Sequence, residues 1–172
     1  MCNFSTRIDI ELARKQLNIS KDVFCEVGIE KWKKIKHKFE EKFIKKDSYK
    51  MQPYWYWSFF KYKTEYIDAN GRQYFLTEKL FSKNEIAYFF ILDSWLDGKF
   101  WFYEGNIESI NKIVYECCLD EYYILDKKYE WFMCCTHHLG FLGYGEKIEK
   151  RMRKFKKEEE EILRILKKRK DL

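Results

Sequence analysis

Two cysteines and two histidines lie close together in the last third of the chain, and their side-chain types suit metal binding or catalysis. The run reads Cys134, Cys135, Thr136, His137 and His138. Alternate side chains of an extended strand point to the same face of a sheet, so Cys135 and His137 are expected to lie side by side. With further ligands this pair would bind a metal ion. Alternatively, the imidazole would deprotonate the thiol for nucleophilic catalysis.

Neither chemistry is complete in the sequence. A metal site or a thiol nucleophile needs a further ligand or orienting group, for which Cys117, Cys118 or a carboxylate would serve. The cysteine pairs of zinc ribbons, glycine-rich phosphate loops and the common hydrolase motifs are all absent. A free cysteine in a core usually acts as a small apolar residue. We therefore expect no cofactor and favour a protein without catalytic activity; a metal-dependent or thiol enzyme that uses Cys135, His137 and His138 is the alternative.

Length and composition indicate one compact domain spanning residues 1–172. A chain of 172 residues buries roughly 70% of its unfolded surface, so its core needs neither disulfides nor metal. Aromatic residues make up 20% and charged residues 36% of the chain, which excludes global disorder. Because the first residues contain no apolar signal core and four of the six cysteines form adjacent pairs, we expect a cytoplasmic protein with reduced thiols. The longest apolar run, 86–92, is too short to span a membrane.

Hydrophobic periodicity predicts helices at both ends of the chain and one in the middle. The expected helices cover residues 6–17, 21–46, 106–119 and 146–170. In the first of them, Ile8, Leu12, Ala13 and Leu17 recur on one side, which we expect to be buried.

Between the helices the sequence predicts a mainly antiparallel sheet. The expected strands cover residues 59–67, 72–80, 87–93, 100–103, 121–125, 129–136 and 140–144. Asn70-Gly71 is a strong hairpin signal, so 59–67 is expected to pair with 72–80 after a short helical turn. The alternative is a helix over 54–68 that begins after Pro53. Short hairpins without a helix after each strand indicate an α+β domain.

The net charge of +6 is concentrated in the C-terminal helix, where residues 146–172 carry 12 basic and 7 acidic side chains. A nucleic-acid binder would contact phosphates through its basic residues, namely Arg151, Arg153, Lys154, Lys156, Lys157 and Lys167 to Lys170. Arg153, Lys154, Lys156 and Lys157 each lie four residues from a glutamate, and such neighbours on a helix offset one another. We therefore favour a solvated helix packed on one side. Its apolar stripe, which is broken by Glu159, would alternatively pair two copies into a homodimer.

The aromatic runs at 54–60 and 100–103 put large side chains on both faces of any strand they form. We favour a two-sided core, with some of these rings left as anchors for a protein partner, because Trp and Tyr are enriched at interfaces. The candidate partner-binding residues are Trp55, Trp57, Arg151, Lys154 and Phe155.

A further pattern appears near the C-terminus: Tyr122-Tyr123-Ile124, Lys127-Lys128-Tyr129-x-Trp131, His137-His138 and Gly143. In these residues the chain resembles a small bacterial family of uncharacterised proteins, and the resemblance implies no activity. The layout is also similar, at the level of fold alone, to bacterial toxin-immunity domains. We expect a bacterial or phage protein that occludes a protein partner, as an immunity protein or an inhibitor of a toxin or defence enzyme does.

Overall fold

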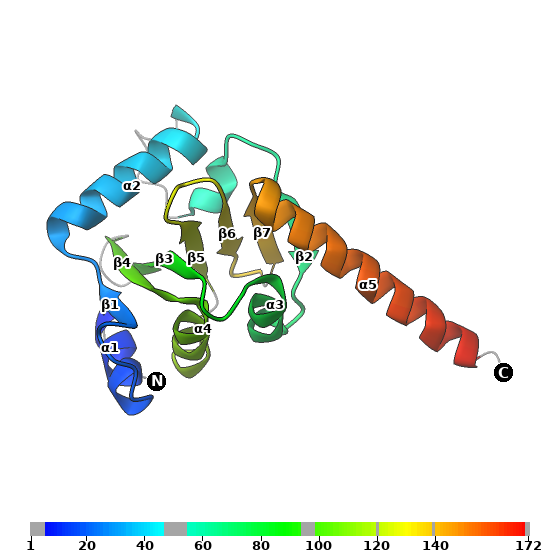
Figure 1. Cartoon of the computed structure of the whole chain (residues 1–172). Coiled ribbons are helices and arrows are strands. Elements are labelled where there is room, and N and C mark those ends of the chain that lie inside the picture. Colours follow the sequence, from blue (N-terminus) through cyan, green and yellow to red (C-terminus); the bar gives the residue numbers. More distant parts are fainter. Residues whose placement is uncertain (1–5, 47–54, 94–98, 120, 139, 171–172) are drawn as a thin grey trace.

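The computed structural model describes residues 6–46, 55–93, 99–119, 121–138 and 140–170. They form an α+β domain in which helices cover both faces of a seven-stranded antiparallel sheet (Figure 1). The strand order is β1-β4-β3-β5-β6-β7-β2. The strands are β1 (Phe24–Glu26), β2 (Glu65–Asp68), β3 (Ile86–Asp93), β4 (Lys99–Asn106), β5 (Tyr122–Asp126), β6 (Phe132–Cys135) and β7 (Gly140–Tyr144). The predicted fold class is confirmed.

Successive side chains of the central strands point to opposite faces of the sheet, and they form one hydrophobic core on each face. In β3, Ala87, Phe89 and Ile91 point to one face of the sheet, and Tyr88 and Phe90 point to the other. β3 pairs with β4 on one side and β5 on the other, so it is an interior strand, as its unbroken apolar sequence predicts. The abundant aromatic residues therefore fill both faces of one sheet.

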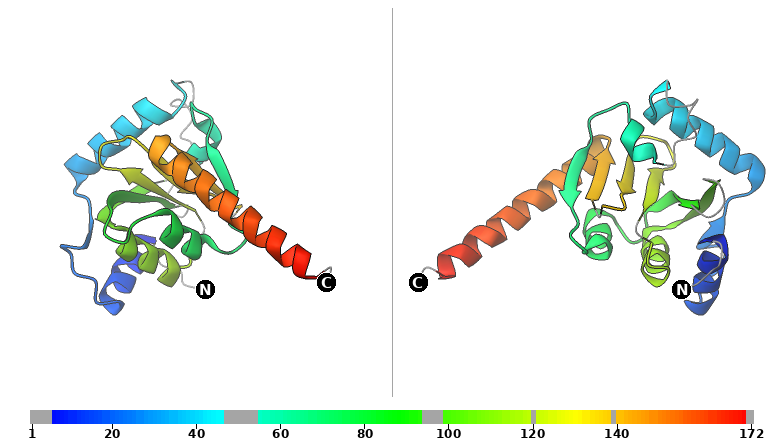
Figure 2. Two further views of the ribbon diagram at one scale, coloured as in Figure 1. Left: turned by 45° about the vertical axis from the view of Figure 1, so that its right-hand side comes forward. Right: turned by 180° about the vertical axis from the view of Figure 1, so that it is seen from behind.

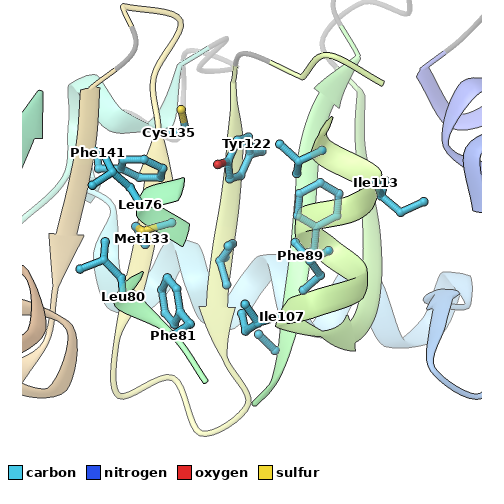
Figure 3. Close-up of a cluster of buried hydrophobic side chains, with 14 of the residues drawn as sticks. Leu76, Leu80, Phe81, Phe89, Ile107, Ile113, Tyr122, Met133, Cys135 and Phe141 are labelled. Carbon is cyan, nitrogen blue, oxygen red and sulfur yellow. The ribbon is translucent and has the colours of Figure 1, made fainter. Parts of the chain in front are cut away.

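The first face is covered by four helices. They are α1 (Thr6–Gln16), α3 (Gln73–Leu80), α4 (Ile107–Glu116) and α5 (Glu146–Lys170). Figure 3 shows this core, where Leu76 and Leu80 of α3 and Ile107 and Ile113 of α4 lie over the sheet. Asn106 caps α4, because its side chain accepts a hydrogen bond from the Ser109 amide at 2.8 Å.

The second face is covered by α2 (Ile29–Phe43) and by the short 3-10 helix η2 (Tyr56–Phe59). Ile35, Phe39 and Phe43 of α2 are buried there, and the Phe39 ring makes edge contacts with Tyr56, Phe90, Tyr123 and Phe132. The short helical turn expected before residue 60 is thus present as η2.

The predicted hairpin between 59–67 and 72–80 is wrong. Residues 73–80 form helix α3, and β2 pairs with β7 instead. Asn70 and Gly71 both adopt positive φ, of 45° and 77°, but they turn the chain from a strand into a helix. Leu76 and Leu80, one helical turn apart, are buried, and this helical spacing decides the structure of the segment.

Two helix predictions also need correction. The segment 21–46 is not one helix, since β1 forms within it and α2 begins only after Gly28. In α1 the buried side chains include Ile10 and Ala13, whereas Ile8 and Leu12 are 47% and 53% exposed. Two of the four residues expected on the buried side are therefore exposed, whereas Ala13 is buried and Leu17 packs against the first core.

Helix α5 begins and ends where the sequence predicts, and its C-terminal half projects away from the sheet (Figures 1 and 2). Ile148, Met152 and Phe155 are its buried residues among those whose side chains the structure describes. None of the described helices combines the length and the apolar character needed to cross a membrane.

Candidate functional site

The two adjacent cysteines are core residues. Cys134 and Cys135 are the last residues of β6, and both are fully buried, on opposite faces of the sheet. Cys135 lies in the same core as Tyr122, Met133 and Phe141 (Figure 3). Burial raises the pKa of the Cys134 thiol well above its usual value, which keeps it protonated and weakly nucleophilic.

The strand ends at Cys135, and this ending separates the thiol from the histidines. The Thr136 amide donates to the Gly140 carbonyl at 2.9 Å, and the Thr136 hydroxyl accepts from the Gly140 amide at 3.3 Å. These bonds close a tight turn from which His137 and His138 project, both exposed. Strand alternation stops at this turn. The structure therefore places His137 next to Trp55 and Trp57, while the thiol of Cys135 points into the core.

His137 is held by a carboxylate at the start of the neighbouring strand. Its Nδ1 lies 2.9 Å from Glu121 Oε2, and Tyr123 donates its hydroxyl to Glu121 Oε1 at 3.2 Å. The Glu121 side chain is only 12% exposed, so this carboxylate is fixed by its surroundings. A carboxylate at Nδ1 orients the ring, favours the Nδ1–H tautomer and leaves Nε2 directed away from it. Burial raises the pKa of Tyr123, which keeps its hydroxyl a donor.

Two tryptophans complete a cluster of four rings. The His137 ring centroid lies 5.6 Å from that of Trp55 and 5.5 Å from that of Trp57. His138 lies 4.1 Å from His137 and 5.8 Å from Trp57. Trp55 is 49% exposed, whereas Trp57 packs partly against the second core. We call Trp55, Trp57, His137 and His138 the Trp–His patch; the structure assembles it from residues that the sequence placed in two unrelated candidate sites.

The patch contains an unmet hydrogen-bond donor. The indole Nε1 of Trp57 is buried and finds no acceptor among the described residues. Leaving a buried donor unpaired costs about 1–3 kcal/mol.

The remaining partner-binding candidates lie elsewhere, on α5. Phe155 is buried in the first core, on the other face of the sheet from Trp57. Arg151 is bound to Glu85 at 3.0 Å, and Lys154 is 79% exposed with Glu158 at 3.7 Å. These three residues are therefore separate from the Trp–His patch.

Four basic residues of α5 bind two carboxylates outside the helix. Arg153 and Lys156 both bind Glu65, at 2.6 and 3.1 Å. Lys147 joins Arg151 on Glu85, at 2.6 Å. The hydrogen bond from Arg153, followed by that from Lys156, lowers the pKa of Glu65. These contacts tie the helix to the sheet, while the side chains of residues 167–170 lie outside the described ones.

Within the described part of the chain, no three His, Cys, Asp or Glu side chains gather closely enough to hold a metal ion. Glu121 is the site residue that the sequence interpretation missed. A signal for it was present, because the turn at 126–131 pairs Tyr122 with Cys135 and so brings Glu121 level with the residues that follow β6. The contact between residues 55–57 and 137–138 had no signal in the sequence.

Comparison with known proteins identifies a family but no activity. The model of a family of unknown function, DUF6756, matches residues 3–156, which is most of the chain. Neither the curated proteins nor the solved structures contain a significant match. The expected membership of an uncharacterised family is thus confirmed, and the chain belongs to the DUF6756 family of unknown function.

Proposed function

We propose that this chain is a binding protein without catalytic activity that occludes a protein partner, and that the Trp–His patch is the centre of its binding surface. The observation that carries the proposal is the half-exposed Trp55 ring beside the exposed imidazole of His137, which in turn lies against that of His138. Tryptophan is the residue type most enriched among those that dominate binding energy at interfaces. An exposed tryptophan next to hydrogen-bonding rings combines an apolar anchor with polar specificity.

Rigidity of the patch supports the same role. His137 is oriented by Glu121, and both residues flank strands of the sheet. Trp57 packs against the second core, which restricts its movement. A surface that is ordered before binding loses less conformational entropy on association, so more of the contact energy appears as affinity.

The partner's surface is expected to present both a hydrogen-bond donor and an acceptor. In the Nδ1–H tautomer that Glu121 favours, Nε2 of His137 accepts a hydrogen bond, whereas the ring N–H of His138 donates one. A cytoplasmic toxin or defence enzyme blocked by an immunity-type protein or inhibitor is the partner class that we favour. Such inhibitors act by covering a surface, and so need no catalytic group of their own.

A capture experiment with matched variants tests the proposal. The wild-type chain, Trp55→Ala and Tyr115→Ala serve as baits in lysate of the native host; Tyr115 is an exposed ring on α4, 64% accessible. We expect a partner that wild type and Tyr115→Ala retain and that Trp55→Ala loses, with affinity reduced by roughly 30-fold or more, as for an interface anchor. Capture of no specific partner, or equal capture by Trp55→Ala, contradicts the proposal.

The contact between Glu121 and His137 supports a second candidate, an enzyme that uses His137 as a general base. Cys135 would not take part directly, because its side chain is buried in the core. A screen with model esters and phosphodiesters tests this alternative. Turnover that is lost in His137→Ala, reduced in Glu121→Gln and kept in His138→Ala would favour the enzyme over the binding protein.

A further inference from the structure

A second candidate site lies beside α1, at the sheet edge formed by β1 and far from α5 (Figure 1). A cleft of about 510 Å³ opens there between α1, β1 and β4. This volume falls within the range typical of small-molecule sites. The sequence motifs gave no indication of this cleft, and the Trp–His patch does not include it.

Two nearly buried polar side chains line the cleft. Tyr103 is only 3% exposed, and among the described residues no group forms a hydrogen bond with its hydroxyl. Arg14 is 9% exposed; three of the five N–H groups of its guanidinium are used, two by Glu11 and one by the Ile19 carbonyl. The floor of the cleft thus holds more hydrogen-bond donors than the protein satisfies.

The charge of the lining favours an anion. Four cationic side chains, Arg7, Arg14, Lys15 and Lys21, face two carboxylates, Glu11 and Glu26. Arg7 binds Glu26 at 2.7 Å, and both Arg14 and Lys15 share Glu11. Lys21 forms no ion pair with any described residue, so an excess of positive charge remains.

The rim of the cleft is apolar. Ile8 and Leu12 lie one turn apart on α1, both line the cleft, and both are about half exposed. The sequence predicted that both side chains would be buried, and the structure leaves them exposed at this rim. Apolar side chains above a floor of donors match a ligand with an apolar body and an acidic head.

We propose that this cleft binds a small organic anion, with a carboxylate or phosphate head and a short apolar body. The head accepts hydrogen bonds from the Tyr103 hydroxyl and the unused N–H groups of Arg14, and it pairs with Lys21. The apolar body lies against Ile8 and Leu12. Since the hydroxyl of Tyr103 lies below the surface, the Arg7 side chain moves aside as the head enters; it is 51% exposed, pairs with Glu26 and lies over the Trp101 ring.

The test is an NMR titration of the whole chain at constant ionic strength with three matched probes: phenyl phosphate, benzoate and the neutral benzyl alcohol. We expect saturable shifts at the cleft residues with at least one anion, and binding of benzyl alcohol at least 10-fold weaker. Tighter binding of phenyl phosphate indicates a phosphorylated natural ligand, and tighter binding of benzoate indicates a carboxylic acid.

Variants locate the binding. Tyr103→Phe and Lys21→Met are each expected to weaken anion binding by about 10-fold, the loss typical of one charge-assisted hydrogen bond. Lys63→Met, an exposed lysine away from the cleft, is the control and should leave affinity unchanged. The same spectra show whether each variant is folded. Lys21→Met changes a surface residue, so it still tests the proposal if Tyr103→Phe perturbs the core. Absence of saturable binding, equal binding of benzyl alcohol, or unchanged affinity in both variants overturns the proposal.

Discussion

Replacing Glu85 by glutamine tests how the long C-terminal helix is held on the domain. The Glu85 side chain is 13% exposed and binds Lys147 at 2.6 Å and Arg151 at 3.0 Å, both on α5. Burial raises the pKa of this carboxyl, but the two hydrogen bonds outweigh burial, and the net pKa is lowered. Glutamine has nearly the same shape, but it removes the charge and leaves one acceptor oxygen in place of two.

The expected cost of Glu85→Gln is modest because the partners are partly solvated. Lys147 is 49% and Arg151 is 31% exposed, so each bond is worth about 0.5–1 kcal/mol after solvent screening. We expect a loss of about 1–2 kcal/mol at pH 7, equivalent to a fall in Tm of roughly 3–6 °C for a chain of this size. Denaturant titration followed by circular dichroism measures the free energy of unfolding, and thermal denaturation measures Tm.

The pH dependence of the same variant gives the sharper result. A carboxylate with a lowered folded-state pKa contributes stability above the unfolded pKa of about 4.3, and that contribution disappears as the pH falls through the folded value. The difference between wild type and Glu85→Gln should therefore shrink below about pH 4. Glu158→Gln is the control, since its carboxylate is 59% exposed and 3.7 Å from Lys154. A Glu85→Gln difference that is absent at pH 7, or that persists undiminished at pH 3, would refute the reasoning.

Three further predictions concern packing, thiol reactivity and the end of α5. Gly143→Ala should destabilise the chain by about 1–3 kcal/mol, because an added Cβ would lie 2.3 Å from Met152 Sδ and 3.2 Å from Ile148 Cγ1. Denaturation measures this loss of stability. A smaller loss in a Met152→Ala background would confirm the contact with Met152 as the cause. Mass mapping after brief treatment of the folded chain with a thiol reagent should find Cys118 labelled and Cys134 unlabelled, since Cys118 is exposed and Cys134 is fully buried. Labelling of both at equal rates would contradict the core position of β6. Removal of residues 161–172 should change Tm by less than about 2 °C in thermal denaturation. The reason is that Phe155 is the last buried residue of α5 among the described side chains. A larger fall would show that the projecting end contributes to stability.

The pattern of the sequence predicted most of the sheet because its strands carry strong local signals. The unbroken apolar run of β3 indicated an interior strand, and the turn residues between β5 and β6 fixed their pairing. Where two local signals competed, the prediction failed. Asn70-Gly71 favoured a hairpin, but the spacing of Leu76 and Leu80 suits a helix, and burial of both leucines against the sheet outweighs the turn preference.

The sequence predicted the Trp and His residues of the candidate site, but it did not predict how they are arranged. Strand alternation correctly placed Cys134 and Cys135 on opposite faces, but it could not be extended to His137, because Thr136 turns the chain by bonding to Gly140. The approach of Trp57 to the histidines depends on how η2 packs over the second core, and this is tertiary packing between segments about eighty residues apart in the sequence. Periodicity carries no information on such contacts.

The two proposed sites can be tested independently, because the sheet separates them. The Trp–His patch lies beyond the ends of β5 and β6, and the anion cleft lies against β1 and β4, with β3 between β4 and β5. Both sites fall within residues 3–156, the part shared with the DUF6756 family, whereas the projecting end of α5 falls outside it. A role common to the family should therefore depend on residues within 3–156 rather than on the end of the helix. If partner capture is lost in Trp55→Ala while anion binding is unchanged, the chain has two separate binding functions; if the anion itself alters partner capture, the two sites are coupled.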